Sequence, residues 1–392
     1  MSDGAHEFLP LSVPVVRGNE WAYTEDCLNT GWLSGAGAYV TRFEDAVRAL
    51  TGARFAVATT TGTAALHVAL SIAGVGAGDA VIVPTATFIA SANAVHYTGA
   101  QPILVGCDEH LGLDADALEA YLDSIDTGGE LVDDVTGLRV KAIMPVHIFG
   151  DPCDMVRVLE IAERFGLAVI EDATESLGSY YTQGPLAGRY TGTLGMAGAF
   201  SFNGNKLITT GGGGMIVTDD EEFAKRARYL VGQAKDDPVR YVHGTVGFNY
   251  ALTNVSAAIG VAQMEQIESF IETKRRNRAR YTEGLADVPG ITVMQAPEGT
   301  FSNSWFFTLL VDADEFGMDR EALMQALSEA KIQSRPLWLP VHMNAPYAGC
   351  RVVSPERAVW FWERILNVPC SSDLTEADVD RVVSTIRSLA RG

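Results

Sequence analysis

A lysine near the middle of the chain has neighbours that suit covalent chemistry. Lys206 ends the run SFNGNK at residues 201–206, and four glycines follow at residues 211–214. The apolar runs at residues 199–202 and 215–218 on either side are typical of strands. An amine in such a loop inside a core is partly desolvated, which favours its neutral, nucleophilic form. Schiff-base chemistry needs an amine of this kind. A surface turn with an unreactive lysine stays the alternative.

Two carboxylates stand at the end of a run that is typical of a buried strand. The run LAVIED occupies residues 167–172 and closes on Glu171 and Asp172. Ligands of open α/β sheets bind beyond the carboxyl ends of the strands. A carboxylate placed there can pair with a pyridinium nitrogen, which pyridoxal phosphate requires to act as an electron sink. The alternative is that Asp172 caps the helix that follows it.

A hydroxyl-rich turn between a predicted strand and a predicted helix suits a phosphate group. Thr61, Gly62 and Thr63 form this turn within the run TTTGTAAL at residues 59–66. Backbone N–H groups and the helix dipole favour an anion there, and threonine hydroxyls donate hydrogen bonds. An ordinary N-cap by Thr61 or Thr63 is the alternative. The chain has no P-loop motif, and the glycines at residues 74–78 follow a helix, so they do not form a dinucleotide fingerprint.

These residues require an α/β scaffold. Strand-like runs alternate with helical patterns from about residue 53 to about residue 220, which predicts a mainly parallel sheet covered by helices on both sides. After about residue 250 the pattern predicts a smaller α+β domain. We therefore expect a large domain at 1–255, with the N-terminal segment packing on a small domain at 256–392. The predicted strands are 55–59, 80–83, 102–105, 140–146, 167–170 and 304–311, and the predicted helices are 63–72, 89–97, 254–278, 320–330 and 376–389.

Composition narrows the possible partners. The 392 residues carry a net charge of −20, which argues against nucleic-acid binding because phosphate backbones attract Lys and Arg. The five cysteines form no C-x-x-C pair, which suits reduced thiols. Neither a signal peptide nor a membrane-spanning run is visible, and the histidines and cysteines have no zinc-like spacing. We expect a cytoplasmic protein with no metal and no membrane partner.

Together these motifs give the chain a resemblance to a known family. It resembles the sugar aminotransferases of the DegT/DnrJ/EryC1/StrS family, which are fold-type-I pyridoxal-phosphate enzymes. The resemblance covers nearly the whole chain, from PLSVP at residues 10–14 through GFNY at residues 247–250 to PVH at residues 340–342. The stretch SFNGNK and the later runs RPLW and PVH resemble in particular the branch that acts on UDP-linked 4-keto-6-deoxy-2-acetamido sugars. That branch serves the biosynthesis of surface glycans.

The resemblance implies a role for each matching residue. Lys206 would bind the cofactor aldehyde covalently and later move a proton to C4 of the sugar, while Asp172 would pair with the pyridinium nitrogen. The other expected cofactor contacts are Thr61, Gly62, Thr63, Phe88, Glu175, Ser201, Asn203 and Asn249. The expected substrate contacts are Ser34, Arg335, Trp338 and His342, although packing within the small domain is an equal alternative for the last three.

The resemblance also implies partners. Asn249 matches a phosphate ligand from the neighbouring subunit, so a homodimer with shared sites is expected. The amino donor is expected to be glutamate, and the acceptor a nucleotide-linked keto sugar. Two positions depart from the family pattern: Ala251 replaces a common Arg, and Gly35 replaces a common Ser. Both departures bear on the substrate more than on the cofactor.

Three other functions make different demands on the sequence. Sugar dehydratases of the same fold carry histidine in place of the Schiff-base lysine, so Lys206 argues against them. A non-catalytic regulator that binds a phosphorylated ligand would keep its cofactor binding after Lys206→Ala. A nicotinamide oxidoreductase needs a strand, a G-x-G-x-x-G turn and a helix in succession, and the chain has no such unit.

Overall fold

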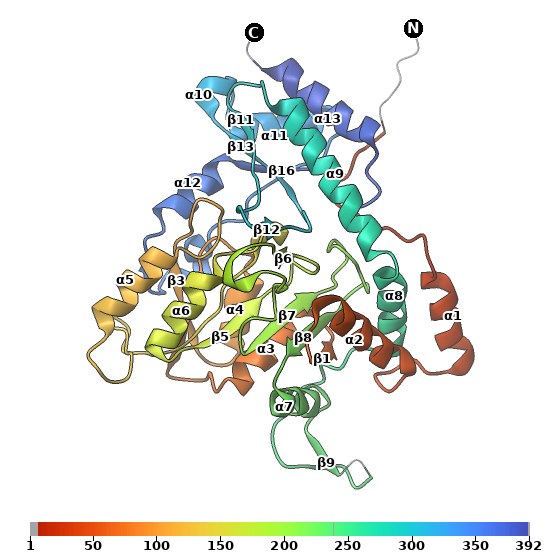
Figure 1. Ribbon diagram of the computed structural model, residues 1–392, viewed down its shortest axis with the longest axis vertical. Coiled ribbons are helices and arrows are strands. Elements are labelled where there is room, and N and C mark those ends of the chain that lie inside the picture. Colours follow the sequence, from red (N-terminus) through yellow and green to blue (C-terminus); the bar gives the residue numbers. More distant parts are fainter. Residues whose placement is uncertain (1–6, 238, 391–392) are drawn as a thin grey trace.

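An eight-stranded sheet forms the centre of the computed structural model, which describes residues 7–237 and 239–390 (Figure 1). The first six residues, which bear on the expected lack of a signal peptide, lie outside the described part. The strand order is β1-β8-β7-β5-β4-β2-β3-β15, and β8 is the strand that runs antiparallel to its two neighbours. The strands are β1 Phe55–Thr59, β2 Asp79–Pro84, β3 Gln101–Val105, β4 Arg139–Ile143, β5 Ala168–Asp172, β7 Ala197–Ser201, β8 Gly214–Thr218 and β15 Val352–Val353.

Helices cover both faces of this sheet, as the alternating pattern predicts. Val81 and Val83 of β2 face one layer, and Ala80 and Ile82 face the other, because successive side chains of a strand point to opposite sides. The first layer consists of α3 Gly62–Ile72, α4 Ala90–Tyr97 and α7 Glu221–Val231. The second consists of α5 Ala115–Ile125 and α6 Met155–Phe165, together with α1 Glu20–Thr30, α2 Ala38–Thr51 and α8 Asn254–Met264 beside β1 and β8.

A second, four-stranded antiparallel sheet lies in the C-terminal part, at the top of Figure 1. Its order is β11-β13-β16-β14, and Leu9 and Leu11 of the N-terminal segment join its apolar core. The division of the chain at residue 255 stays a prediction. The elements of this part are β11 Ile291–Val293, β13 Phe307–Val311, β14 Arg335–Pro336, β16 Ile365–Val368, α9 Ile267–Leu285, α10 Ala313–Phe316, α11 Arg320–Glu329, α12 Glu356–Arg364 and α13 Glu376–Leu389.

The prediction of a single helix at 254–278 is wrong, because the helix is interrupted between α8 and α9. Glu265 and Gln266 at the break are good helix formers, so their types do not reveal it. The side-chain amides of Gln263 and Gln266 both donate to Oε1 of Glu20, at 2.6 and 3.1 Å. These tertiary hydrogen bonds stabilise the bend, which helical periodicity alone does not encode.

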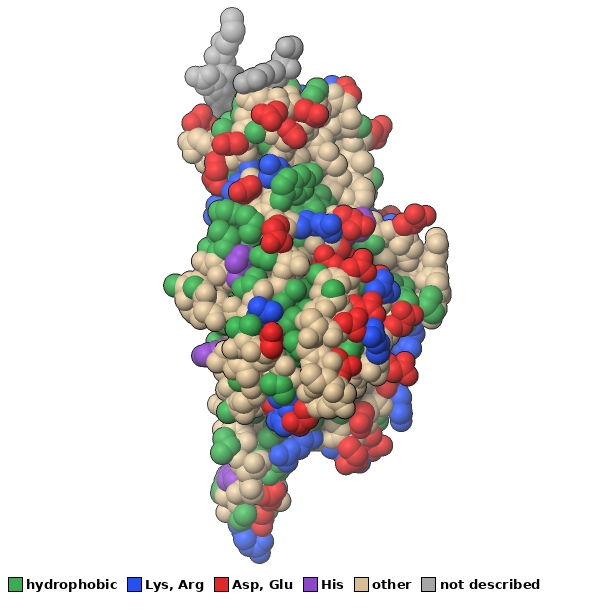
Figure 2. Space-filling model, turned by 90° about the vertical axis from the view of Figure 1, so that its left-hand side faces the viewer, with side chains coloured by type: hydrophobic (Ala, Val, Ile, Leu, Met, Phe, Trp, Pro, Cys, Tyr) green, Lys and Arg blue, Asp and Glu red, His purple; other side chains and the backbone are tan. Residues whose placement is uncertain are grey.

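A hairpin arm projects from the sheet below α7 (Figures 1 and 2). It contains β9 Lys235–Asp237 and β10 Val242–His243, and the sequence reading did not foresee it. A further two-stranded pair joins β6 Tyr180–Tyr181 to β12 Thr300–Phe301. Within the described residues, no helix combines the length and the apolar character that a membrane span requires.

Candidate active site

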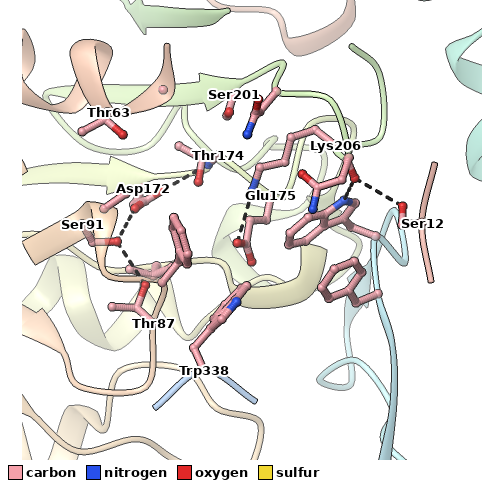
Figure 3. A pocket seen from close by; sticks show the side chains of 18 of the residues that line it. Ser12, Thr63, Thr87, Ser91, Asp172, Thr174, Glu175, Ser201, Lys206 and Trp338 are labelled. Carbon is pink, nitrogen blue, oxygen red and sulfur yellow. Dashed lines mark hydrogen bonds and ion pairs between the residues drawn. The ribbon is translucent and has the colours of Figure 1, made fainter. Parts of the chain in front are cut away.

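A cavity of about 770 Å³ opens beyond the carboxyl ends of β5 and β7, where residues of the C-terminal part close it (Figure 3). A cavity of this size is typical of a site for a cofactor or small ligand. Most of the residues predicted for the site line it. They are Thr61, Gly62, Thr63, Phe88, Asp172, Glu175, Ser201, Asn203, Lys206, Arg335 and Trp338.

The side chain of Lys206 points into this cavity rather than into solvent. Only 13% of it is exposed, and its Nζ lies 3.3 Å from Oε1 of Glu175. The ring of Trp305 covers Nζ from another side, with 3.9 Å between the nitrogen and the ring centroid. The alternative of a surface turn does not apply, because the amine is enclosed by a carboxylate and an aromatic face.

Asp172 ends β5 and presents its carboxylate to the same cavity. Its Oδ2 accepts a hydrogen bond of 2.7 Å from Ser91 Oγ, which is itself 3.0 Å from Thr87 Oγ1. Its Oδ1 accepts a hydrogen bond of 3.1 Å from the backbone N–H of Thr174. These hydrogen bonds fix the orientation of the carboxylate, which can pair with a cationic ring nitrogen.

Glu175 lies between the lysine and the backbone of the loop at residue 149. Its Oε2 accepts a hydrogen bond of 2.7 Å from the Phe149 N–H, and its Oε1 faces Lys206. Burial raises the pKa of the Glu175 carboxyl, while the charge of Lys206 opposes that rise. The carboxyl is held beside the amine by its contacts with the Phe149 N–H and with Lys206.

The turn before α3 has the form of an anion cradle. Thr61 caps the helix, since its Oγ1 accepts a hydrogen bond of 3.0 Å from the N–H of Ala64. A Cβ at Gly62 would lie 2.8 Å from the Cβ of Ser201 and 2.9 Å from Cγ2 of Thr174, so glycine is required there. This close approach brings the helix N-terminus and the Ser201 hydroxyl to one place, where a phosphate binds favourably. Capping by Thr61 and the predicted phosphate site are therefore compatible.

Aromatic side chains form one wall of the cavity. The rings of Phe88 and Trp338 lie 5.4 Å apart between centroids, and Phe88 is about half exposed. Trp338 also lies 5.1 Å from the ring of Phe149. A planar ring can stack against such a wall, so the predicted stacking by Phe88 stays compatible with the geometry.

Three predicted site residues lie outside the lining of this cavity. Ser34 and Asn249 are exposed, and Nδ1 of His342 lies 2.7 Å from Thr85 Oγ1. Their contacts with ligand stay predictions. The two departures from the family pattern lie together, because a Cβ at Gly35 would be 3.4 Å from the Cβ of Ala251. Gly35 and Ala251 therefore alter the same small region of the protein rather than two separate regions.

Sequence reasoning missed three residues of the site. Ser91 and Thr174 hold Asp172, and Trp305 covers Lys206. A serine on the first turn of α4 and a threonine two residues after Asp172 give no distinctive signal. Trp305 fell inside the predicted strand 304–311, yet β13 begins only at Phe307 and leaves Trp305 in a turn above the lysine.

Comparisons with known proteins agree with this geometry. The family model described as "DegT/DnrJ/EryC1/StrS aminotransferase family" matches residues 14–387. The chain belongs to the DegT/DnrJ/EryC1/StrS aminotransferase family. The GDP-perosamine synthase of Caulobacter vibrioides is 39% identical over 380 residues, which are 96% of this chain and 97% of the relative. The GDP-perosamine synthase of Escherichia coli O157:H7 is 36% identical and covers 97% of this chain and 98% of its own length.

A solved structure shares the fold. DesI, crystallised in the presence of its TDP-sugar product, superposes with a TM-score of 0.87 at 28% identity, over 98% of this chain and 93% of that one. As a member of the DegT/DnrJ/EryC1/StrS family, the chain is a sugar aminotransferase and uses pyridoxal phosphate. The residues present fit that cofactor, because a cradle that a Cβ would fill, a fixed carboxylate and an enclosed amine share one cavity.

Proposed function

We propose that this aminotransferase moves an amino group from an amino acid, glutamate, to the C4 keto group of a nucleotide-linked 4-keto-6-deoxy sugar. The observation that carries the proposal is that Lys206, Asp172 and the turn at Thr61–Thr63 face one cavity. Such an arrangement offers an amine, a counter-charge for a pyridinium ring and a phosphate cradle in a single space. The proposed reaction has two halves, in which the donor leaves its nitrogen and the sugar then takes it.

Each of these groups has a defined task in the proposal. The bound cofactor supplies an electron sink for the carbon that loses its proton. Lys206 Nζ removes a proton from Cα of the amino acid and returns one at C4 of the sugar, as a positioned base and acid. Asp172, whose Oδ2 accepts a hydrogen bond from Ser91, would pair with a positive charge, and the turn at Gly62 would hold the anionic end of the ligand. Glu175 holds the amine in place while it is free.

The nucleotide is proposed from the relatives rather than from the motifs. Both curated relatives named above are GDP-perosamine synthases, and neither name supports the UDP-linked 2-acetamido sugar that the motifs favoured. We therefore propose a GDP-linked keto sugar as the acceptor. Arg335 and Trp338 line the cavity, and we propose that they contact this sugar nucleotide. A homodimer that shares its sites through Asn249 completes the proposal.

Reduction with borohydride tests the role of Lys206. Borohydride fixes a Schiff base, so we expect peptide mapping of the reduced wild-type protein to find the cofactor on Lys206. The Lys206→Ala variant should lack this adduct and show no spectral change with glutamate. The matched control Lys225→Ala removes an exposed lysine of α7 and should behave as the wild type. An adduct on another lysine would refute the proposed anchor.

A substrate panel tests the acceptor separately. Purified enzyme and glutamate are incubated with GDP-, UDP- and dTDP-linked 4-keto-6-deoxy sugars, and the amino sugars formed are measured by mass spectrometry. We expect amine formation with the GDP-linked sugar to exceed that with the others. A preference for the UDP-linked 2-acetamido sugar would contradict the proposed nucleotide without touching the role of Lys206.

A further inference from the structure

A second lysine is buried outside the lining of the cavity, and the mechanism above gives it no task. Lys274 belongs to α9 and is 1% exposed. Its Nζ donates a hydrogen bond of 3.0 Å to the carbonyl oxygen of Trp305 and another to that of Cys370. A buried amine is costly unless its hydrogen bonds are made, and an apolar side chain of similar length would avoid the cost. The position therefore calls for an explanation.

The two carbonyls belong to neighbouring ends of two paired strands. Trp305 lies just before β13, and Cys370 lies just after β16. These strands pair antiparallel, with Phe307 opposite Val368, so the end of one strand lies beside the start of the other. One amino group thus ties the turn that carries Trp305 to the neighbouring strand and to α9.

The turn itself is held by further contacts. The backbone N–H of Trp305 donates to Oδ1 of Asn303 at 2.9 Å, and the indole stacks on Phe306 with 4.0 Å between ring centroids. Ser304 has φ +53°, a left-handed conformation that costs a non-glycine residue free energy. Such a conformation persists where surrounding contacts determine it. The turn therefore has one defined shape.

This shape places the indole against the reactive loop at two points. Trp305 Nε1 donates a hydrogen bond of 2.7 Å to the carbonyl oxygen of Asn205, the residue before Lys206. The indole face lies 3.9 Å from Lys206 Nζ, within the range of a cation–π interaction. The same ring thus holds the backbone of the loop and covers the end of its lysine.

We propose that Trp305 holds the amine of Lys206 in the cavity while it is not bound to the cofactor, and that Lys274 is the positioning residue that fixes Trp305. The inference depends on the proposed role of Lys206. The inference predicts that a substitution of Trp305 or Lys274 exposes the amine of Lys206. Such a substitution should also change the pH dependence of catalysis. A purely structural Lys274 would lower stability without either effect.

The test measures the reactivity of Lys206 directly. Full-length protein is loaded with pyridoxamine phosphate, which has no aldehyde and leaves the lysine amine free. The rate of reductive methylation of Lys206 is then followed by peptide mass spectrometry. Trp305→Leu removes the aromatic face and should raise this rate about 2- to 30-fold, the range expected for a lost cation–π contact. Lys274→Met should raise it in the same direction, and Trp305→Phe should lie between Trp305→Leu and the wild type.

A second readout and matched controls complete the design. The pH profile of kcat should shift in the Trp305 and Lys274 variants, while Lys225→Met and Trp360→Leu, at exposed positions, should retain the wild-type profile and methylation rate. Circular dichroism identifies any variant that fails to fold, and Trp305→Phe provides the milder change. Unchanged methylation and pH profiles in the folded variants would overturn the inference. A missing borohydride adduct on wild-type Lys206 would instead overturn the proposed function.

Discussion

Asp172 and Glu171 are adjacent in sequence and reach opposite sides of β5. Asp172 faces the cavity, whereas Glu171 is buried away from it and accepts hydrogen bonds from the N–H groups of Gly192, Leu194 and Gly195. The alternation of side chains along a strand separates the two. Glu171 therefore orders the loop at residues 192–195, and Asp172 faces the cavity, where a ligand can bind.

The charge of Asp172, rather than its shape, is expected to matter. Asp172→Asn keeps the side-chain size but cannot hold a protonated pyridine, so kcat should fall by about 10²–10³-fold, the usual loss for a preorganised electrostatic contact. Ser91→Ala removes one hydrogen bond to the carboxylate and should cost only about tenfold or less. Steady-state kinetics on both variants measures the difference. Equal activities for Asp172→Asn and wild type would refute the assigned charge.

At the scale of elements, the sequence predicts what depends on local pattern. The alternating helices and strands of the sheet follow from periodicity, and α13 begins and ends where predicted because its apolar face and the Thr375 capping box are local signals. The break before α9 and the turn at Trp305 depend on contacts between distant segments. The residues that line the cavity were therefore predicted better than the residues that hold them in position.

The base of the hairpin arm packs on a buried histidine of α3. The ring of His67 lies 4.7 Å from that of Phe248 and 6.0 Å from that of Tyr250, and it is 7% exposed. These two residues flank Asn249. Burial lowers the pKa of His67 from its ordinary value of 6.5. Protonation of His67 is therefore less favourable in the folded chain than in the unfolded chain.

This lowered pKa predicts a pH-dependent stability. The contribution of His67 is fully present above pH 6.5 and is lost as the pH falls through the lowered pKa of the folded state. His67→Gln should therefore reduce the fall in Tm between pH 7.5 and 5.5, by on the order of 1–2 °C. Thermal unfolding at the two pH values measures this. The control variant His96→Gln, at an exposed position, should show the same fall in Tm as the wild type. If His67→Gln also shows the wild-type fall in Tm, the prediction is wrong.

At the scale of the whole molecule, exposed apolar side chains lie on two peripheral elements, α1 and the hairpin arm (Figure 1). Trp21 and Leu28 of α1 are mostly exposed, as are Val239 and Val246 of the hairpin arm. Scattered apolar residues need no explanation, but groups of them on projecting elements are typical of interfaces. Asn249 at the base of the arm lies outside the cavity of its own chain. These features support the proposed dimer, in which each arm serves the neighbouring site.

A shared site makes a sharp prediction for mixed dimers. Lys206→Ala and Asn249→Ala should each give weakly active or inactive protein alone. If Asn249 acts in the partner's site, a mixed dimer combines both lesions in one site and leaves the other intact. Random mixing of equal amounts should then restore about a quarter of the wild-type activity, because half of the dimers are mixed and one of their two sites works. If both residues act within one chain, every site of a mixed dimer carries a lesion and the mixture stays as weak as its parents. Size-exclusion chromatography with differently tagged chains confirms that subunits have exchanged, so that a lack of recovery counts against the shared site.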